Sequence, residues 1–164
     1  MAAYTSTVLW ERRDAPFLEQ RYSRAHRWRF DGGLDLPASA SAAHVPAGTA
    51  DPSGVDPEEA FVAALSSCHM LFFLSLASRR GLVVERYQDD AEGRLTRDSQ
   101  GRESMTQVVL RPRVRYAPGR DGALPDPDLQ AALHHEAHAL CYLANSVRTE
   151  VRVEPVDDER LAPG

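Results

Sequence analysis

One segment limits the folds open to this chain: residues 56–80 (DPEEAFVAALSSCHMLFFLSLASRR) predict a long helix that is apolar on almost every side. Asp56 is a suitable N-cap, Pro57 suits the first helical position, and Gly81 supplies the stop. The middle of the helix, Phe61–Ala77, presents little polar surface and should therefore be buried on most sides. A chain of 164 residues cannot readily cover such a helix alone, so we expect an obligate homodimer.

Short strands and one further helix are predicted around this segment. The predicted strands are Tyr4–Trp10, Arg21–Phe30, Leu82–Thr96, Met105–Tyr116 and Val147–Val153, and the second helix is Asp128–Leu143, with Asp126 as its candidate cap and Pro127 at its start. The Ala-, Ser-, Pro- and Gly-rich segment Pro37–Val55 indicates a long loop. This order predicts an α+β fold, in which two helices cover one or more mostly antiparallel sheets. We expect a single domain over residues 1–164, with a frayed acidic tail at 156–164.

Composition and charge exclude several classes of function. The net charge is -5, with 19 basic and 24 acidic residues, so binding to nucleic acid is not expected. Every basic residue is arginine, which excludes lysine Schiff-base chemistry and a P-loop lysine. The longest apolar run, Met70–Ala77, is shorter than the ~20 residues of a membrane span, so no membrane partner is expected. No signal peptide is visible, and we expect a reducing, cytoplasmic location.

Two cysteines are the first candidates for chemistry. Cys68 lies in the middle of the apolar helix, where Ser66 and Ser67 interrupt the apolar pattern, and Cys141 lies at the end of the second helix. Each is an inert core residue, a metal ligand or, if the two helices pack together, one half of a reversible disulfide. A thiol in the middle of a helix gains little from the helix dipole and needs a nearby cation to become a thiolate.

Arg24 is the preferred cation, with Arg13 and Arg21 as alternatives. In the predicted strand Arg24 shares a face with Trp28 and Phe30, and we expect that face to be buried. An arginine on a buried face needs an anionic partner.

Glu58 in the first turn of the helix is one candidate partner, although a carboxylate there also favours the helix dipole by itself. Glu58 precedes Cys68 by ten residues, or ~15 Å along the axis. A Glu58 that acts beside Cys68 would therefore come from a second subunit.

The second helix also carries a group of histidines. His134, His138 and Cys141 are spaced so that they share one helix face, which is compatible with zinc ligation. No HExxH, CxxC or fourth ligand accompanies them, so the pattern is weak, and a polar helix face explains it as well. We expect no metal and no cofactor, and keep zinc binding as an alternative.

Two motifs together resemble the OsmC/Ohr family of osmotically inducible and organic hydroperoxide resistance proteins. The first is PEEAFVAALSSCHM around Cys68, and the second is AHALCYLANSVRTEVRVEP around Cys141. The resemblance extends from about Tyr4 to Pro155. It implies an intertwined homodimer in which long central helices pack between sheets and two active sites lie at the subunit interface.

The resemblance also implies a thiol-dependent peroxidase that reduces organic hydroperoxides. By position, Cys68 resembles the peroxidatic cysteine, Cys141 the resolving cysteine, and Glu58 the glutamate that pairs with the site arginine. An external thiol reductant reopens the disulfide, and lipoyl-bearing proteins serve that purpose for Ohr-type relatives. The alternative is a non-enzymatic OsmC-like domain that binds a small apolar ligand.

The resemblance leaves the site arginine open. In Ohr-type members the arginine follows the first strand, which would point to Arg13. In OsmC-type members it lies in the loop before the helix, but here Pro37–Val55 contains no arginine. We choose Arg24 because its strand face points inward.

Overall fold

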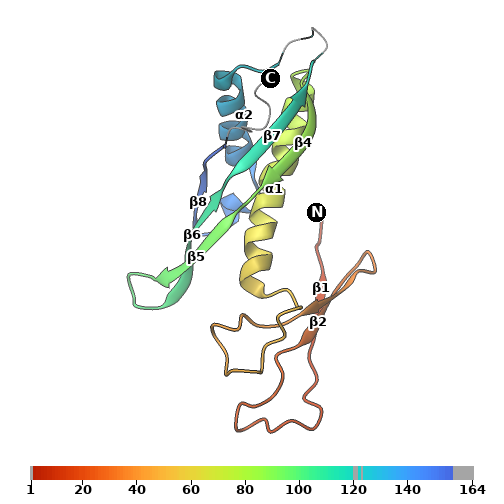
Figure 1. Cartoon of the computed structure of the whole chain (residues 1–164), viewed down its shortest axis with the longest axis vertical. Helices are drawn as coiled ribbons and strands as arrows, with labels where there is room; N and C mark the ends of the chain where they lie inside the picture. The colour runs from red at the N-terminus through yellow and green to blue at the C-terminus, as the bar shows by residue number, and fades with distance from the viewer. Residues whose placement is uncertain (1, 120–121, 123, 157–164) are drawn as a thin grey trace, which may run out of the picture. The chain divides into compact units, whose positions relative to one another are not determined.

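A computed structural model describes residues 2–119, 122 and 124–156, and its contacts divide the chain into two compact units, residues 1–60 and 61–164. Figure 1 shows the elements, whose bounds are β1 Ser6–Leu9, β2 His26–Phe30, β3 Asp35–Ala38, α1 Pro57–Arg79, β4 Val83–Asp89, β5 Glu92–Arg97, β6 Glu103–Leu110, β7 Pro112–Ala117, α2 Pro127–Leu140, the 3-10 turn η1 Ala144–Ser146 and β8 Glu150–Val153. The predicted α+β class is confirmed. From residue 157, the predicted tail lies outside the described residues.

The first unit contains an antiparallel three-stranded sheet in the order β1-β2-β3. The prediction of a strand from Arg21 is wrong, because pairing begins only at His26. The preceding segment folds instead around an aromatic cluster in which the Phe17 and Tyr22 rings stack at 4.7 Å and Trp10 meets Tyr22 edge-on at 5.3 Å. Arg24 therefore precedes the strand and does not share its face.

The third strand was not predicted, and it shortens the predicted loop Pro37–Val55. Pro37 and Ala38 pair with β2, and Ala38 forms an isolated parallel bridge with Val55. The fully buried Ser39 fixes the rest of the loop, because its hydroxyl accepts the Asp51 N–H at 2.8 Å. Because these contacts fix both ends of the loop, α1 begins at a defined position.

The helix α1 begins and ends where the sequence indicates. The Glu59 N–H donates to Asp56 Oδ1 at 2.7 Å, and the Asp56 N–H donates to Glu59 Oε2 at 3.3 Å, so the two side chains cap each other's backbone. Gly81 adopts a φ of 76°, the left-handed conformation that ends many helices and that glycine adopts without strain.

Two apolar clusters of the second unit cover opposite parts of α1. Leu65 in its first half packs against Val108 and Leu110 of β6. In its second half, Phe73, Leu76 and Ala77 pack against α2, and residues of β4 and β7 surround them. Fully burying one such Leu or Phe contributes about 1.5–3 kcal/mol.

By length and composition, α1 is also the one helix of the described residues that would suffice to cross a membrane. Core helices of soluble proteins meet the same criterion. The buried residues of α1 pack on β6 and on α2, and 33% of its most apolar window is buried within the chain.

The two long strands predicted after α1 are each broken into two. Leu82–Thr96 becomes β4 and β5, which leaves an antiparallel pair β4-β7 and a second sheet β5-β6-β8. The break coincides with the half-buried carboxylate of Asp89. It accepts the Ser66 hydroxyl of α1 at 2.5 Å through Oδ2 and the Arg111 N–H at 2.5 Å through Oδ1. Arg111 lies between β6 and β7, so one side chain joins the helix to both bends.

The C-terminal elements are close to those predicted. Asp126 caps α2, because its Oδ1 accepts the Leu129 N–H at 2.7 Å, and Pro127 stands in the first turn. The helix ends at Leu140, three residues earlier than predicted, and η1 follows it. The last strand, β8, pairs in parallel with β6.

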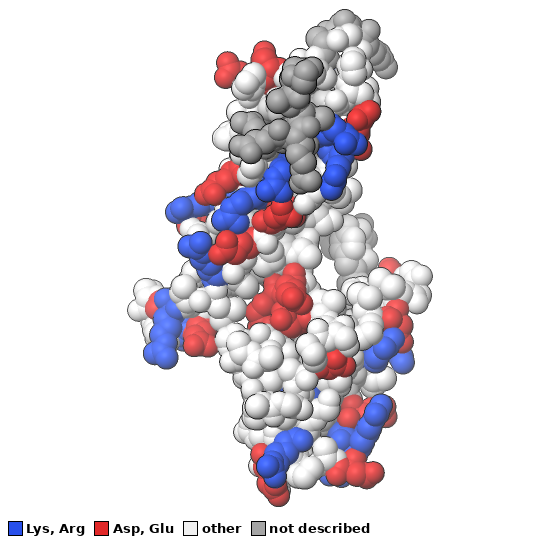
Figure 2. All heavy atoms as spheres, in the orientation of Figure 1, with Lys and Arg blue, Asp and Glu red and all other residues white. Residues whose placement is uncertain are grey.

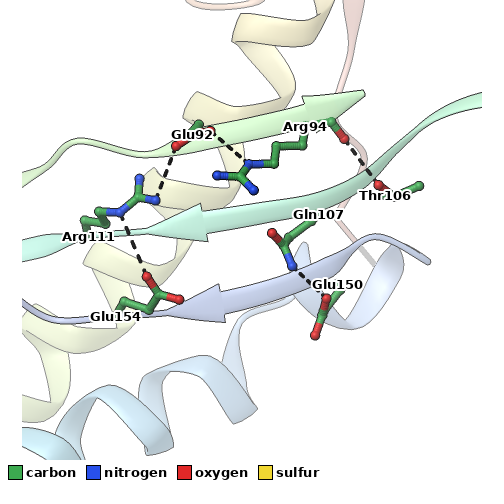
Figure 3. Close-up of polar contacts among 7 residues, drawn as sticks. All are labelled: Glu92, Arg94, Thr106, Gln107, Arg111, Glu150 and Glu154. Carbon is green, nitrogen blue, oxygen red and sulfur yellow. Dashed lines mark hydrogen bonds and ion pairs between the residues drawn. The ribbon is translucent and has the colours of Figure 1, made fainter. Parts of the chain in front are cut away.

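Figure 2 shows basic and acidic side chains interleaved over strands of the second unit. Figure 3 shows one such series across β5, β6 and β8. Glu92 pairs with Arg94 at 2.9 Å and with Arg111 at 3.2 Å, and Arg111 approaches Glu154 at 3.9 Å. Exposed pairs of this kind contribute roughly 0–1 kcal/mol each, so they do not determine the fold.

We predict that the Asp89 contacts are a main source of polar stability. Ser66→Ala should lower the free energy of unfolding by about 1–2 kcal/mol, and Asp89→Ala by about 2–3 kcal/mol, because buried groups lose hydrogen-bond partners. Urea denaturation measures both values. The adjacent, exposed Ser67 offers a matched control, and Ser67→Ala should change stability little. Equal losses at Ser66 and Ser67 would contradict the interpretation.

Candidate active site

The central feature of the second unit is a groove on α1 that contains Cys68. Its volume is about 440 Å³. The lining residues are Ala64, Ser67, Cys68, Leu71, Phe72, Ser75, Tyr142 and Leu143. These positions recur every three or four residues along α1, so one helix face forms the floor. The half-buried Cys68 thus combines access to the groove with a mostly apolar setting.

Cys141 lies at the C-cap of α2 and is far less accessible, with 1% of its surface exposed. Its N–H donates to the His138 carbonyl at 3.2 Å, and its carbonyl accepts the Asn145 N–H at 3.0 Å. The sulfur accepts the Ala144 N–H at 3.5 Å. The end of α2 and the start of η1 therefore hold this thiol in place through backbone contacts.

The structure brings the two thiols together as neighbours, and both are free. Burial raises the pKa of the Cys141 thiol to about 11, and a side-chain hydrogen bond with Cys68 contributes to the same increase. Cys141 therefore remains a neutral thiol at neutral pH. The two cysteines therefore differ in accessibility.

A buried pair of histidines lies between the same two helices, and sequence analysis did not identify it. His69 Nε2 and His134 Nδ1 are 3.1 Å apart, and the rings are parallel at a centroid distance of 5.4 Å. His134 also stacks on Phe73 at 4.3 Å. The available signal was that His69 and His134 each lie within a segment predicted to be helical.

The zinc alternative is not supported by this arrangement. No group of three or more His, Cys, Asp or Glu side chains within residues 2–119, 122 and 124–156 is arranged to hold a metal ion. His134, one of the three suggested ligands, directs Nδ1 to His69, while Cys141 lies beside Cys68. The three residues share a helix but do not converge on one point.

The other predicted site residues, Arg24 and Glu58, belong to the first unit. The guanidinium of Arg24 lies 3.7 Å from the centre of the Tyr22 ring and donates to the carbonyls of Gln20 at 3.0 Å and Tyr22 at 2.6 Å. Glu58 is half-buried in the first turn of α1. The proposed roles of both residues stay predictions.

The two alternative arginines lie in the same unit. Arg13 has a positive φ of 52°, which is uncommon for a residue with a side chain, and it lines a pocket of about 300 Å³ together with Arg12 and Arg27. The Arg21 N–H donates to the Pro16 carbonyl at 3.2 Å.

Comparison with known proteins gives a consistent result. The family model described as OsmC-like protein matches residues 48–156. An OsmC-like protein of unknown function from Vibrio cholerae is 47% identical, with a TM-score of 0.90 and coverage of 95% of this chain and 100% of that chain. No protein with a curated description matches the chain.

Two more distant structures share the fold. The organic hydroperoxide resistance protein OhrB of Bacillus subtilis is 22% identical, with a TM-score of 0.62 and coverage of 96% of this chain and 100% of that chain. An organic hydroperoxide resistance protein from Legionella pneumophila is 18% identical, with a TM-score of 0.64 and coverage of 96% and 98%.

We predict that acid destabilises the protein through the buried histidines. Burial lowers the pKa of His69 to about 3 and that of His134 to about 4, from 6.5. The unfolded chain therefore binds more protons below pH 6.5, and stability that is complete above this pH is lost as the pH falls toward 4. Each histidine contributes up to about 1.4 kcal/mol per pH unit in this range.

Thermal unfolding between pH 7.5 and 5 measures this effect. The double variant His69→Leu/His134→Leu should show a shallower decrease in Tm with falling pH. His135→Leu alters an exposed histidine of the same helix and should keep the wild-type slope. The same slope in all three proteins would show that other groups cause the acid sensitivity.

Proposed function

The chain belongs to the OsmC-like family, and from this premise we propose that it is a thiol-dependent peroxidase that reduces organic hydroperoxides to alcohols. One observation carries the proposal: two neighbouring free thiols differ in depth, and the more accessible one lines an apolar groove. An accessible thiol can react with a substrate, and a neighbouring buried thiol can then react with the sulfenic acid that forms.

In the proposed first step, the Cys68 thiolate attacks the distal oxygen of the hydroperoxide. The O–O bond breaks, Cys68 becomes a sulfenic acid, and the alkoxide takes up a proton and leaves as the alcohol. The groove beside Cys68 is mostly apolar, with Leu71 and Phe72 in its wall. This lining favours an organic hydroperoxide over hydrogen peroxide, because burial of an alkyl or aryl group adds binding free energy.

In the second step, Cys141 condenses with the sulfenic acid. A Cys68–Cys141 disulfide forms and the sulfenic hydroxyl leaves as water, with the proton from the Cys141 thiol. The raised pKa of Cys141 supports this division of roles, since a thiol that stays protonated is a poor nucleophile toward peroxide.

An external dithiol then reduces the disulfide and restores both thiols. A lipoyl-bearing protein is the class of reductant that the resemblance suggests. The cycle needs a reducing compartment, and for that reason we propose a cytoplasmic location.

We further propose that Arg24 and Glu58 act together to favour the thiolate of Cys68. Arginine remains charged at any relevant pH, and its planar guanidinium can hold a carboxylate with one edge while another edge faces the substrate. The contacts of Arg24 with two backbone carbonyls and the Tyr22 ring would have to be exchanged for this role. Arg13 and Arg21 remain the alternatives.

We also propose that the protein is a homodimer in which a second copy covers the groove face of α1. Only 33% of the most apolar window of α1 is buried within the chain, and Leu71 on the groove face is 62% exposed. An apolar face of this kind around a reactive thiol favours a partner surface that excludes water. Within one chain, Glu58 and Cys68 are ~15 Å apart along α1. A second copy would supply its own Glu58 to act beside Cys68.

Turnover of cumene hydroperoxide with a dithiol reductant tests the peroxidase. Cys68→Ser should abolish turnover, because it removes the nucleophile. Cys141→Ser should permit one oxidation per chain and leave a sulfenic acid that dimedone traps. Equal reactivity of both variants would contradict the assigned roles, and absence of turnover in the wild type would favour the ligand-binding alternative.

The rate of Cys68 alkylation as a function of pH tests the two charged residues. Arg24→Ala and Glu58→Ala should each slow alkylation at neutral pH, roughly tenfold for the arginine, since the thiolate loses its cation. The double variant should cost less than the sum of the single variants, because the residues act as a unit. An unchanged profile in Arg24→Ala would move the assignment to Arg13 or Arg21.

Light scattering tests the dimer at micromolar concentration. We expect Leu71→Arg to produce monomers, because it places a charge in the covered face. Leu124 is also 62% exposed but lies outside α1, so Leu124→Arg is a matched control that should stay dimeric. A stable wild-type monomer would reject the dimer and the shared site.

A further inference from the structure

The two helices that carry the thiols share a polar contact in an otherwise apolar interface. His69 of α1 is 0% exposed and His134 of α2 is 4% exposed. Their 3.1 Å contact joins α1 to α2 in the buried part of the interface. The surrounding cluster of Phe73, Leu76, Ala77, Leu133 and Ala137 is apolar. A buried polar group that loses its hydrogen-bond partner costs free energy, so this contact restricts how the two helices can pack.

The pair is close in sequence to both cysteines. His69 directly follows Cys68 on α1. His134 lies on α2 two turns before Cys141, and His138, one turn before it, accepts the Cys141 N–H at its carbonyl. A change in how His69 meets His134 therefore changes how the end of α2 meets the Cys68 turn.

We propose that His69 and His134 are positioning residues that fix α1 against α2 in the arrangement where Cys141 reaches Cys68. Closure of the disulfide depends on them, whereas the first reaction of Cys68 does not. This assignment rests on the proposed function only for the purpose of the disulfide in the catalytic cycle. Disulfide closure itself can be measured without any peroxide.

The physical reason is directionality. Apolar side chains tolerate small sliding and rotation of two packed helices, since their attraction does not depend on angle. A hydrogen bond between two imidazoles needs a narrow range of distance and angle. One ring is the donor and the other is the acceptor. Sliding of α2 along α1 would leave two buried polar atoms without partners, which costs free energy.

The hydrogen bond between His69 and His134 also depends on the protonation state of the two rings. Both nitrogens of an imidazole are donors only when the ring is charged, so protonation of the acceptor ring breaks the bond. The charges that act on His69 come from His134 and His138 of α2. Tyr87 of β4 and Tyr116 of β7 border the same cluster, and burial raises the pKa of both, so they stay neutral. Arg80 and Glu136 pair with each other at 2.5 Å on the outside of the two helices.

Reaction of the reduced protein with 4,4′-dithiodipyridine separates the two steps. The Cys68 thiolate attacks the reagent, which breaks its S–S bond, forms a mixed disulfide and releases one thiopyridone. Cys141 then attacks Cys68 in the mixed disulfide, forms the Cys68–Cys141 bond and releases a second thiopyridone. Absorbance records both phases, and the second reports closure alone.

We expect His69→Leu and His134→Leu each to slow the second phase about tenfold at pH 7.5, with the first phase close to wild type. The exposed His135→Leu on the same helix should change neither phase. The double variant His69→Gln/His134→Asn should restore the second phase to within about threefold. Glutamine places an amide group near the imidazole Nε2 and asparagine near Nδ1, and neither titrates.

The pH dependence separates positioning from simple loss of stability. Because burial lowers the pKa of His134 to about 4, the second phase of the wild type should slow more steeply than that of the amide variant as the pH falls toward 4. Leucine variants that close at the wild-type rate, or an amide variant that closes no faster than they do, would overturn the proposal. A wild type that fails to reduce hydroperoxides but shows these two phases would reject the peroxidase and leave the positioning roles standing.

Discussion

An apolar helix must be covered on every side, and this requirement organises the whole second unit. The two halves of α1 are covered by different partners: β6 lies against Leu65, while α2, β4 and β7 surround Phe73. The bend that lets one antiparallel ribbon serve both halves occurs where Asp89 joins Ser66 to the Arg111 backbone. The face of α1 left over after this arrangement is the one that carries Cys68.

The accessibility of the two thiols depends on where the packed surface of α1 ends. Cys68 lies at the margin between packed and open surface, and Cys141 lies just inside it at the end of α2. Because burial opposes ionisation, the pKa of the more deeply buried Cys141 is raised. The histidine contact one residue further along α1 adds direction to an interface that apolar packing leaves free to slide.

Local signals in the sequence predict much of this fold, and tertiary contacts explain the rest. The caps Asp56 and Asp126 and the stop at Gly81 work within a few residues, so the limits of both helices are readable except at Leu140. The break near Asp89 depends on a partner 23 residues away in α1, which no local pattern reveals. Arg24 was placed on a strand because its segment alternates, but aromatic contacts of Tyr22 take that segment out of the sheet. The sequence singled out Cys68 and Cys141, which the structure places as neighbours, while the contact of His69 with His134 needed the packed helices.

The parallel pairing of β8 with β6 has a consequence for newly made chains. Translation proceeds from the N-terminus, so a nascent chain exposes Cys68 well before Cys141 and β8 have been synthesised. The sheet β5-β6-β8 cannot close until its last strand leaves the ribosome. During that interval Cys68 has no second thiol in the chain with which to form a disulfide. The order of the elements along the chain thus leaves Cys68 without its neighbouring thiol until the end of α2 has been made.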